Sequence, residues 1–127
     1  MVSSKYMKGY LGERELLYKL YDKGYVVLRS PRSGRIGLPT PDIVAIKKSK
    51  VYAIECKSRN IAFIVPKEQL DQLKEWVEKA GAIAYIAWKI PRKGWKFISL
   101  EDAIKNNGKI SKRFCDLVGK DFDEIFL

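Results

Sequence analysis

Two short apolar runs of this chain each contain an acidic residue, and this combination constrains the fold more than any other feature. Residues 41–46 read Pro-Asp-Ile-Val-Ala-Ile, and residues 51–57 read Val-Tyr-Ala-Ile-Glu-Cys-Lys. Both runs are rich in β-branched residues, which is typical of buried strands. An ionised carboxylate in such a strand is costly unless it is paired or binds a metal ion. Asp42 and Glu55 are therefore candidate functional residues.

A tight hairpin through Lys48-Ser49-Lys50 would bring these two acids together. Because side chains alternate across a strand, Glu55 and Lys57 project from the same face, and Asp42 can lie beside them. Two carboxylates next to an ammonium form an oxygen-rich cation site, as in metal-assisted phosphodiester hydrolysis. The alternative for Glu55 and Lys57 is a surface ion pair, which contributes only about 0–1 kcal/mol. The upstream Pro-Asp favours the functional interpretation.

A third acid, Glu13, faces inward from a predicted helix over residues 10–23. It lies three, four and seven residues before the leucines of one face, which are Leu16, Leu17 and Leu20. This spacing puts Glu13 at the centre of the apolar stripe. Glu15 lies on the opposite side, four residues before Lys19, and is expected to form an ordinary solvated ion pair with it. Glu13 is either a first-turn acid favoured by the helix dipole or a direct or water-mediated ligand of the cation at Asp42 and Glu55.

The net charge of +10 over 127 residues is concentrated in the first half of the chain. Residues 1–60 carry 13 basic and 5 acidic side chains, residues 61–100 carry 7 and 4, and residues 101–127 carry 5 and 6. A basic half that also holds the inward-facing acids suggests that an acidic polymer is brought to a metal site. A basic surface alone would indicate only solubility or nonspecific adhesion.

The residue types that are missing exclude several classes of function. The chain has no histidine, which rules out histidine-based zinc sites and Ser-His-Asp triads. Its two cysteines, Cys56 and Cys115, suit a reducing cytosol better than a disulfide framework. We see no signal peptide and no apolar stretch of transmembrane length, so we expect a cytoplasmic protein.

The remaining sequence predicts an alternation of strands and helices. Strands are expected over residues 26–29, 83–89 and 94–100, a proline- and glycine-containing loop over 30–41, and a helix from Pro66 to Ala80 that ends at Gly81. Gln69 shares the apolar face of that helix, so it either approaches the site or lies at the edge of the core. The large apolar side chains Trp76, Trp88, Trp95 and Phe97 are core residues by default, with a dimer surface as the alternative.

Five motifs, in order and spacing, resemble the archaeal Holliday junction resolvases, members of the PD-(D/E)xK nuclease superfamily. They are Gly-x-x-Gly-Glu13-Arg14-Glu15-Leu16, Val27-Leu28-Arg29-Ser30-Pro31-Arg32-Ser33, Pro41-Asp42, Ile54-Glu55-Cys56-Lys57 and Gly94-Trp95-Lys96-Phe97. The resemblance covers roughly the first hundred residues. It implies an α/β, restriction-endonuclease-like fold, a mixed central sheet flanked by helices.

The resemblance also implies roles for individual residues. It assigns the Mg²⁺ ligands to Glu13, Asp42 and Glu55 and the catalytic lysine to Lys57. A catalytic serine maps onto Ser33, with nearby Ser30 as the alternative. DNA-binding arginines are expected at Arg14 and Arg29 and, because guanidiniums suit phosphate contacts, at Arg32 and Arg35 of the 30–41 loop. The alternative interpretation of the 30–41 loop is a mobile connector without a role in DNA binding.

We therefore expect a single nuclease domain over residues 1–127, with a core over about 1–100 and a C-terminal extension over 101–127. The expected protein is a homodimeric, Mg²⁺-dependent endonuclease that resolves four-way DNA junctions in recombination and repair. The alternatives are another nuclease of this fold, acting on duplex ends, flaps or RNA, and a junction-binding module without catalysis. The acidic tail 121–127 is either a docked terminal helix or a binding motif for a replication or repair protein.

Overall fold

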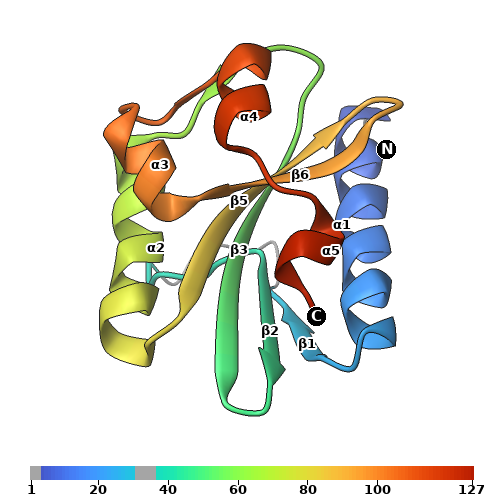
Figure 1. Ribbon diagram of the computed structural model, residues 1–127, viewed down its shortest axis with the longest axis vertical. Helices are drawn as coiled ribbons and strands as arrows, with labels where there is room; N and C mark the ends of the chain where they lie inside the picture. The colour runs from blue at the N-terminus through green and yellow to red at the C-terminus, as the bar shows by residue number, and fades with distance from the viewer. Residues whose placement is uncertain (1–3, 31–36) are drawn as a thin grey trace.

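A five-stranded mixed sheet forms the centre of the protein, as the computed structural model shows in Figure 1. The structure describes residues 4–30 and 37–127, with side chains described from residue 12 onward in the first helix. The strand order is β1-β2-β3-β5-β6, and only β3 and β5 run parallel. The strands are β1 (Val26–Arg29), β2 (Ile43–Lys47), β3 (Lys50–Ser58), β5 (Ile83–Ile90) and β6 (Gly94–Ser99). This mixed sheet is the architecture expected from the sequence.

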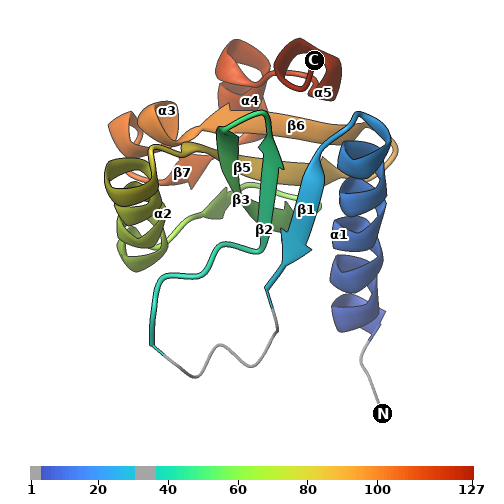
Figure 2. The same cartoon turned by 90° about the horizontal axis from the view of Figure 1, so that it is seen from below.

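Helices cover both faces of the sheet (Figures 1 and 2). α1 (Ser4–Asp22) and α5 (Phe122–Ile125) pack on one face, and α2 (Lys67–Ala80), α3 (Leu100–Lys105) and α4 (Lys112–Val118) pack on the other. A small second sheet pairs β4 (Phe63–Ile64) with β7 (Lys109–Ile110). None of the helices in the described part of the chain is long and apolar enough to cross a membrane.

The sequence predicts both ends of helix α2 correctly, whereas it does not predict the start of helix α1. Pro66 directly precedes the first residue of α2, and Gly81 ends the helix with φ +66°, a left-handed conformation that glycine adopts without strain. The Gly81 N–H donates to the Val77 carbonyl, and the Ala82 N–H donates to the Trp76 carbonyl. Both ends match the prediction. α1 instead begins at Ser4, six residues before the predicted start, because helix-compatible residues continue beyond the apolar stripe that marks the buried part.

The aromatic side chains are mostly core residues. Trp88 and Phe97 are fully buried, Trp95 is nearly so, and Trp76 is half-buried on α2. The core interpretation of Trp88, Trp95 and Phe97 is thus confirmed, whereas Trp76 stays partly accessible.

The C-terminal tail is a docked terminal helix. A capping box at Asp121 and Glu124 starts α5, and the Phe122 and Phe126 side chains are buried in the same cluster as Tyr52. The Phe126 ring meets the Tyr52 ring edge to face at a centroid distance of 5.0 Å. A partner for this tail stays a prediction, and these phenylalanines would have to leave the core to meet it.

Candidate active site

The β2–β3 hairpin places Asp42 across from Glu55. The two turn residues, Lys48 and Ser49, have φ of 47° and 71°, which is typical of the two-residue loops that match the twist of paired strands. Ile43 then pairs with Ile54, so the next pair in this register is Asp42 with Glu55. The predicted hairpin is thus present, but its turn consists of Lys48 and Ser49 alone, because Lys50 already belongs to β3 and pairs with Lys47.

Lys57 lies two residues after Glu55 on the same face of β3, and helix α2 covers that face. The Lys57 Nζ donates a hydrogen bond of 2.8 Å to the Gln69 Oε1 of α2, whereas the Glu55 Oε2 lies 3.9 Å away. The Lys57 and Glu55 side chains are only 12% and 16% exposed. The nearest partner of the ammonium is therefore a neutral amide, and Gln69, whose role the sequence left open, belongs to the site.

A backbone hydrogen bond fixes the Asp42 carboxylate. Its Oδ2 accepts from the Cys56 N–H at 2.8 Å, and the Asp42 carbonyl accepts from the Ser30 N–H at 2.9 Å. Cys56 itself alternates to the other face of β3 and packs against the core there. Asp42 is thus held by both neighbouring strands.

Glu13 faces inward, as predicted, and is only 5% exposed. The Arg29 Nε at the end of β1 lies 3.1 Å from its Oε1. The predicted surface pair of Glu15 with Lys19 is wrong: both Glu15 carboxylate oxygens accept from the Lys89 Nζ at 3.0 Å. Strand β5 brings Lys89 to the exposed side of α1, a tertiary contact that helical spacing cannot predict.

Burial raises the pKa of the Glu55 carboxyl, and the Asp42 carboxylate raises it further, so that it reaches about 8 instead of 4.5. The Lys57 ammonium and a backbone hydrogen bond from Asp42 act in the opposite direction, and Glu13 adds a smaller increase. Lys57 therefore only partly offsets the negative charge at this end of the sheet. The closeness of the two acids therefore favours either a proton on Glu55 or a cation beside both carboxylates.

Within the described ranges 4–30 and 37–127, no three acidic or cysteine side chains lie close enough together to hold a metal ion on their own. Asp42 and Glu55 nevertheless offer the hard oxygen donors that Mg²⁺ prefers, and burial and the Asp42 carboxylate raise the pKa of Glu55, an effect that a bound cation would oppose. The donor set fits a divalent cation. Glu13, bound by Arg29, remains a predicted ligand.

Several predicted site residues lie away from the pair of Asp42 and Glu55 or fall outside the described residues. Ser33, Arg32 and Arg35 fall in the segment 31–36, which the structure does not describe. The Ser30 hydroxyl donates to the Pro41 carbonyl and so closes the base of the loop. Arg14 is exposed on α1, with its guanidinium 5.6 Å from the centre of the Tyr18 ring.

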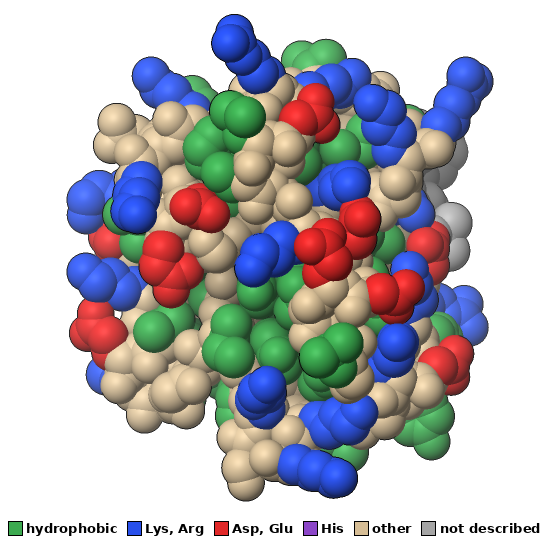
Figure 3. All heavy atoms as spheres, viewed as in Figure 1, with side chains coloured by type: hydrophobic (Ala, Val, Ile, Leu, Met, Phe, Trp, Pro, Cys, Tyr) green, Lys and Arg blue, Asp and Glu red, His purple; other side chains and the backbone are tan. Residues whose placement is uncertain are grey.

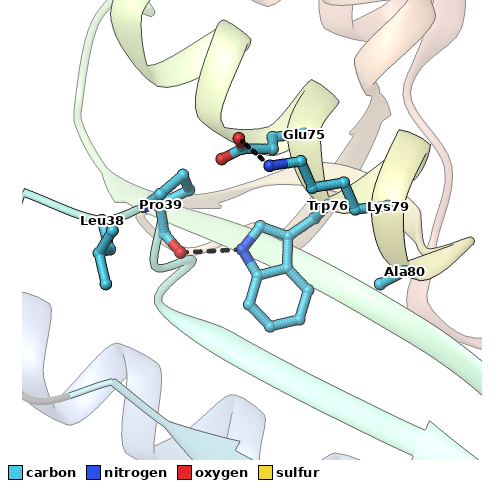
Figure 4. Close-up of a pocket in the computed structure, with 6 residues that line it drawn as sticks. All are labelled: Leu38, Pro39, Glu75, Trp76, Lys79 and Ala80. Carbon is cyan, nitrogen blue, oxygen red and sulfur yellow. Dashed lines mark hydrogen bonds and ion pairs between the residues drawn. The ribbon is translucent and has the colours of Figure 1, made fainter.

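Nothing in the sequence indicates that Trp76 holds the segment 38–41, which leads to Asp42. The Trp76 Nε1 of α2 donates to the Pro39 carbonyl at 3.0 Å, and Leu38 and Pro39 line a groove with this indole (Figure 4). In Figure 2 the chain after residue 37 returns from beside α2 to β2. The apolar spacing of α2 places Trp76 on the inner side but gives no sign of this partner.

The mixed sheet, with two carboxylates and a lysine at one end, defines the restriction-endonuclease-like class of nuclease folds. The chain matches the archaeal Holliday junction resolvase (Hjc) family over residues 4–124, and it belongs to that family. The match includes the positions of Glu13, Asp42, Glu55 and Lys57 and extends through most of the C-terminal extension.

Similar proteins support this membership along nearly the whole chain. The crossover junction endodeoxyribonuclease Hjc of Archaeoglobus fulgidus is 33% identical over 129 residues, covering 94% of this chain and 95% of that protein. The protein of the same name from Sulfolobus acidocaldarius is 32% identical over 123 residues, covering 93% and 85%. The solved structure of A. fulgidus Hjc superposes with a TM-score of 0.84 at 30% identity, covering 94% of this chain and all of that one.

The raised pKa of Glu55 predicts a pH-dependent stability in the absence of divalent cations. Between about pH 5 and 8 the folded protein keeps a proton on Glu55 that the unfolded chain has lost, so the free energy of unfolding falls as pH rises, at most by about 1.4 kcal/mol per pH unit. The chain has no histidine, the side chain whose ordinary pKa lies in this window. Urea denaturation in chelator should show this decline in the wild type and a flatter profile for Glu55→Gln. Equal profiles would contradict the assignment.

Proposed function

We propose that this chain is a crossover junction endodeoxyribonuclease that resolves four-way DNA junctions, known as Holliday junctions, by hydrolysing phosphodiester bonds. The observation that carries the proposal is the family match over residues 4–124. The hairpin register, which sets Asp42 against Glu55 with Lys57 beside them, supplies side chains suited to this chemistry.

The cofactor we propose is Mg²⁺, held by Asp42 and Glu55 with Glu13 as a further ligand. When bound, the cation supplies a Lewis acid for the scissile phosphate and lowers the pKa of water. For this role the Glu55 carboxyl must lose the proton that its raised pKa favours, and a nearby positive charge drives that loss.

Lys57 stabilises negative charge that develops on the phosphate or orients the attacking water. Its ammonium is largely buried, and Gln69 holds it at 2.8 Å, so it needs little reorganisation when the substrate arrives. Pre-oriented charges in a partly dry site stabilise a transition state more than mobile ones do. Arg29 keeps Glu13 at the same end of the sheet through its 3.1 Å contact.

DNA binding is assigned to Arg14 and Arg29, together with Arg32, Arg35 and a catalytic Ser33 in the undescribed part of the loop. The face shown in Figure 3 mixes Lys and Arg with Asp and Glu, so it is not a continuous basic surface. The net charge of +10 therefore favours a DNA surface elsewhere, such as the end of the sheet where Asp42 and the loop lie.

A homodimer would present two active sites to a substrate with twofold symmetry. Helix α2 leaves the β1–β2 side of its face of the sheet uncovered, so that Val26, Leu28 and Ile46 are exposed there, with Val26 directly opposite Ile46. The Trp76 groove of α2 lies on the same side of the sheet. We propose that this apolar surface is the dimer interface.

The activity is tested with a synthetic four-way junction and its linear duplex, in Mg²⁺ and in chelator. We expect cleavage of the junction only with Mg²⁺. Equal cleavage of the duplex would favour another nuclease of this fold, and binding without cleavage would favour a junction-binding module.

Asp42→Asn and Glu55→Gln should each abolish cleavage and spare junction binding. Both changes keep the shape of the side chain but remove a charged ligand, and they also remove repulsion of the phosphate. Gel-shift and single-turnover assays measure the two properties separately. Retention of most activity by either variant, with Mg²⁺ below saturation, would mean that these residues do not form the metal site.

Gln69→Leu should slow single-turnover cleavage on the order of ten- to a hundredfold while leaving junction affinity intact. Without its acceptor, the Lys57 ammonium moves onto Glu55 and leaves its working position. Gln72→Leu, three residues further along the same helix and not hydrogen-bonded to Lys57, is the matched control and should cleave normally. The role of Gln69 is wrong if both variants cleave at the same rate.

The dimer should persist at high salt, because salt screens charge but does not weaken hydrophobic burial. Sedimentation equilibrium at micromolar concentration should give a twofold mass for the wild type and for Leu117→Glu, whose site is exposed on α4. Leu28→Glu should give a monomer. A monomeric wild type would contradict the apolar interface.

A further inference from the structure

A groove of about 390 Å³ lies between helix α1 and the edge strand β1, next to the candidate active site. Its volume lies in the range of small-ligand pockets. Arg14, Tyr18 and Tyr21 line it at helical spacings of four and seven residues, which puts them on one side of α1. The rest of its lining is Leu17 of the helix and Val27 and Arg29 of the strand.

Two exposed tyrosines make this groove unusual. Tyr18 and Tyr21 are 57% and 65% exposed, and neither belongs to a core cluster. Packing of the core therefore does not require a tyrosine at either position. Leu16 and Leu20 of the same helix, in contrast, are fully buried in the core. Exposed aromatic rings that lie close together on a protein surface are typical of contact sites for a ligand or a partner.

The charged groups of the groove are cationic. The Arg14 guanidinium lies 5.6 Å from the centre of the Tyr18 ring, and Arg29 closes the groove from the strand side. Aromatic rings interleaved with arginines are typical of surfaces that bind single-stranded nucleic acid, where bases stack on the rings and phosphates meet the guanidiniums. The positive charge of these arginines suits the regularly spaced phosphates of a nucleic acid better than it suits a protein surface of mixed charge.

The groove adjoins the candidate active site at Arg29, which binds Glu13. Glu13 directly precedes Arg14, and the Glu13 carboxylate binds Arg29, so the cationic end of the groove adjoins the inward-facing acid. β1 is the outer strand of the sheet, so the groove opens at its edge. The groove therefore runs from Arg14 and Arg29, beside Glu13, to the two tyrosines.

We propose that this groove is a nucleobase-binding subsite, in which an unpaired base at the branch point of the junction stacks on Tyr18 and Tyr21. The inference rests on the proposed function. Bases inside a duplex are already stacked and paired, and those at a branch point leave the stack at lower cost. The subsite thus favours a branched substrate over a linear one, without reading base sequence.

The first test measures binding of a four-way junction in chelator, with the salt concentration varied. The double variant Tyr18→Leu, Tyr21→Leu should bind about tenfold more weakly with an unchanged slope of log affinity against log salt, because tyrosine releases no counterions. Arg14→Ala should flatten that slope by about 0.9 units. The double phenylalanine variant should recover most of the lost affinity, because it restores both rings. Leu117→Ala, on α4, is the control outside the groove.

The second test uses a junction with 2-aminopurine at the branch point. The emission of this base depends on what it stacks on, so the bound junction should emit differently with the wild type and with the double leucine variant, and alike with the wild type and with the double phenylalanine variant. Equal emission and equal affinity would overturn the subsite. A double leucine variant that sediments as a monomer would also overturn it, in favour of a protein interface.

These outcomes are separable from failure of the proposed function. If the wild type cleaves the junction and the double leucine variant behaves identically, only the subsite is wrong. If the wild type neither binds nor cleaves the junction in Mg²⁺, the proposed function is wrong and the subsite falls with it.

Discussion

The pairing of β2 with β3 is the constraint on which the candidate site depends. Two turn residues with positive φ, Lys48 and Ser49, fix the register, and that register sets Asp42 opposite Glu55. A slip of β2 by one residue against β3 would put the two acids on opposite faces of the sheet. Both strands are largely buried, so such a slip would also expose core side chains, and the fold thereby enforces the position of the two carboxylates.

The charges at the site are left partly unbalanced. The Lys57 ammonium could have formed a close ion pair with Glu55, which would have neutralised the acid. It instead bonds to Gln69 at 2.8 Å and stays 3.9 Å from Glu55. Burial and Asp42 can then raise the pKa of Glu55 to about 8. Such a site is unfavourable without a cation, and the rest of the core must supply the stability that it lacks.

The sequence predicts the parts of the fold that follow from local patterns. The strand 26–29, both ends of α2 and the inward phase of Glu13 all follow from alternation, Pro and Gly punctuation, and helical spacing. The site acids follow from their cost in apolar strands. Long-range partners do not follow. The contact of Gln69 with Lys57, that of Trp76 with Pro39 and the replacement of Lys19 by Lys89 as the partner of Glu15 all require the tertiary arrangement.

The C-terminal extension supports the β2–β3 hairpin at its turn, the end that lies away from Asp42 and Glu55. The Lys47 Nζ, at the end of β2, donates to the carbonyls of Lys23 and Leu127, both at 2.9 Å. This single ammonium joins the strand to the end of α1 and to the chain terminus, while Phe126 packs on Tyr52 of β3. The hairpin is thus held at its turn end by residues far away in sequence. Its other end, where Asp42 and Glu55 lie, is left open to a charged substrate without loss of register.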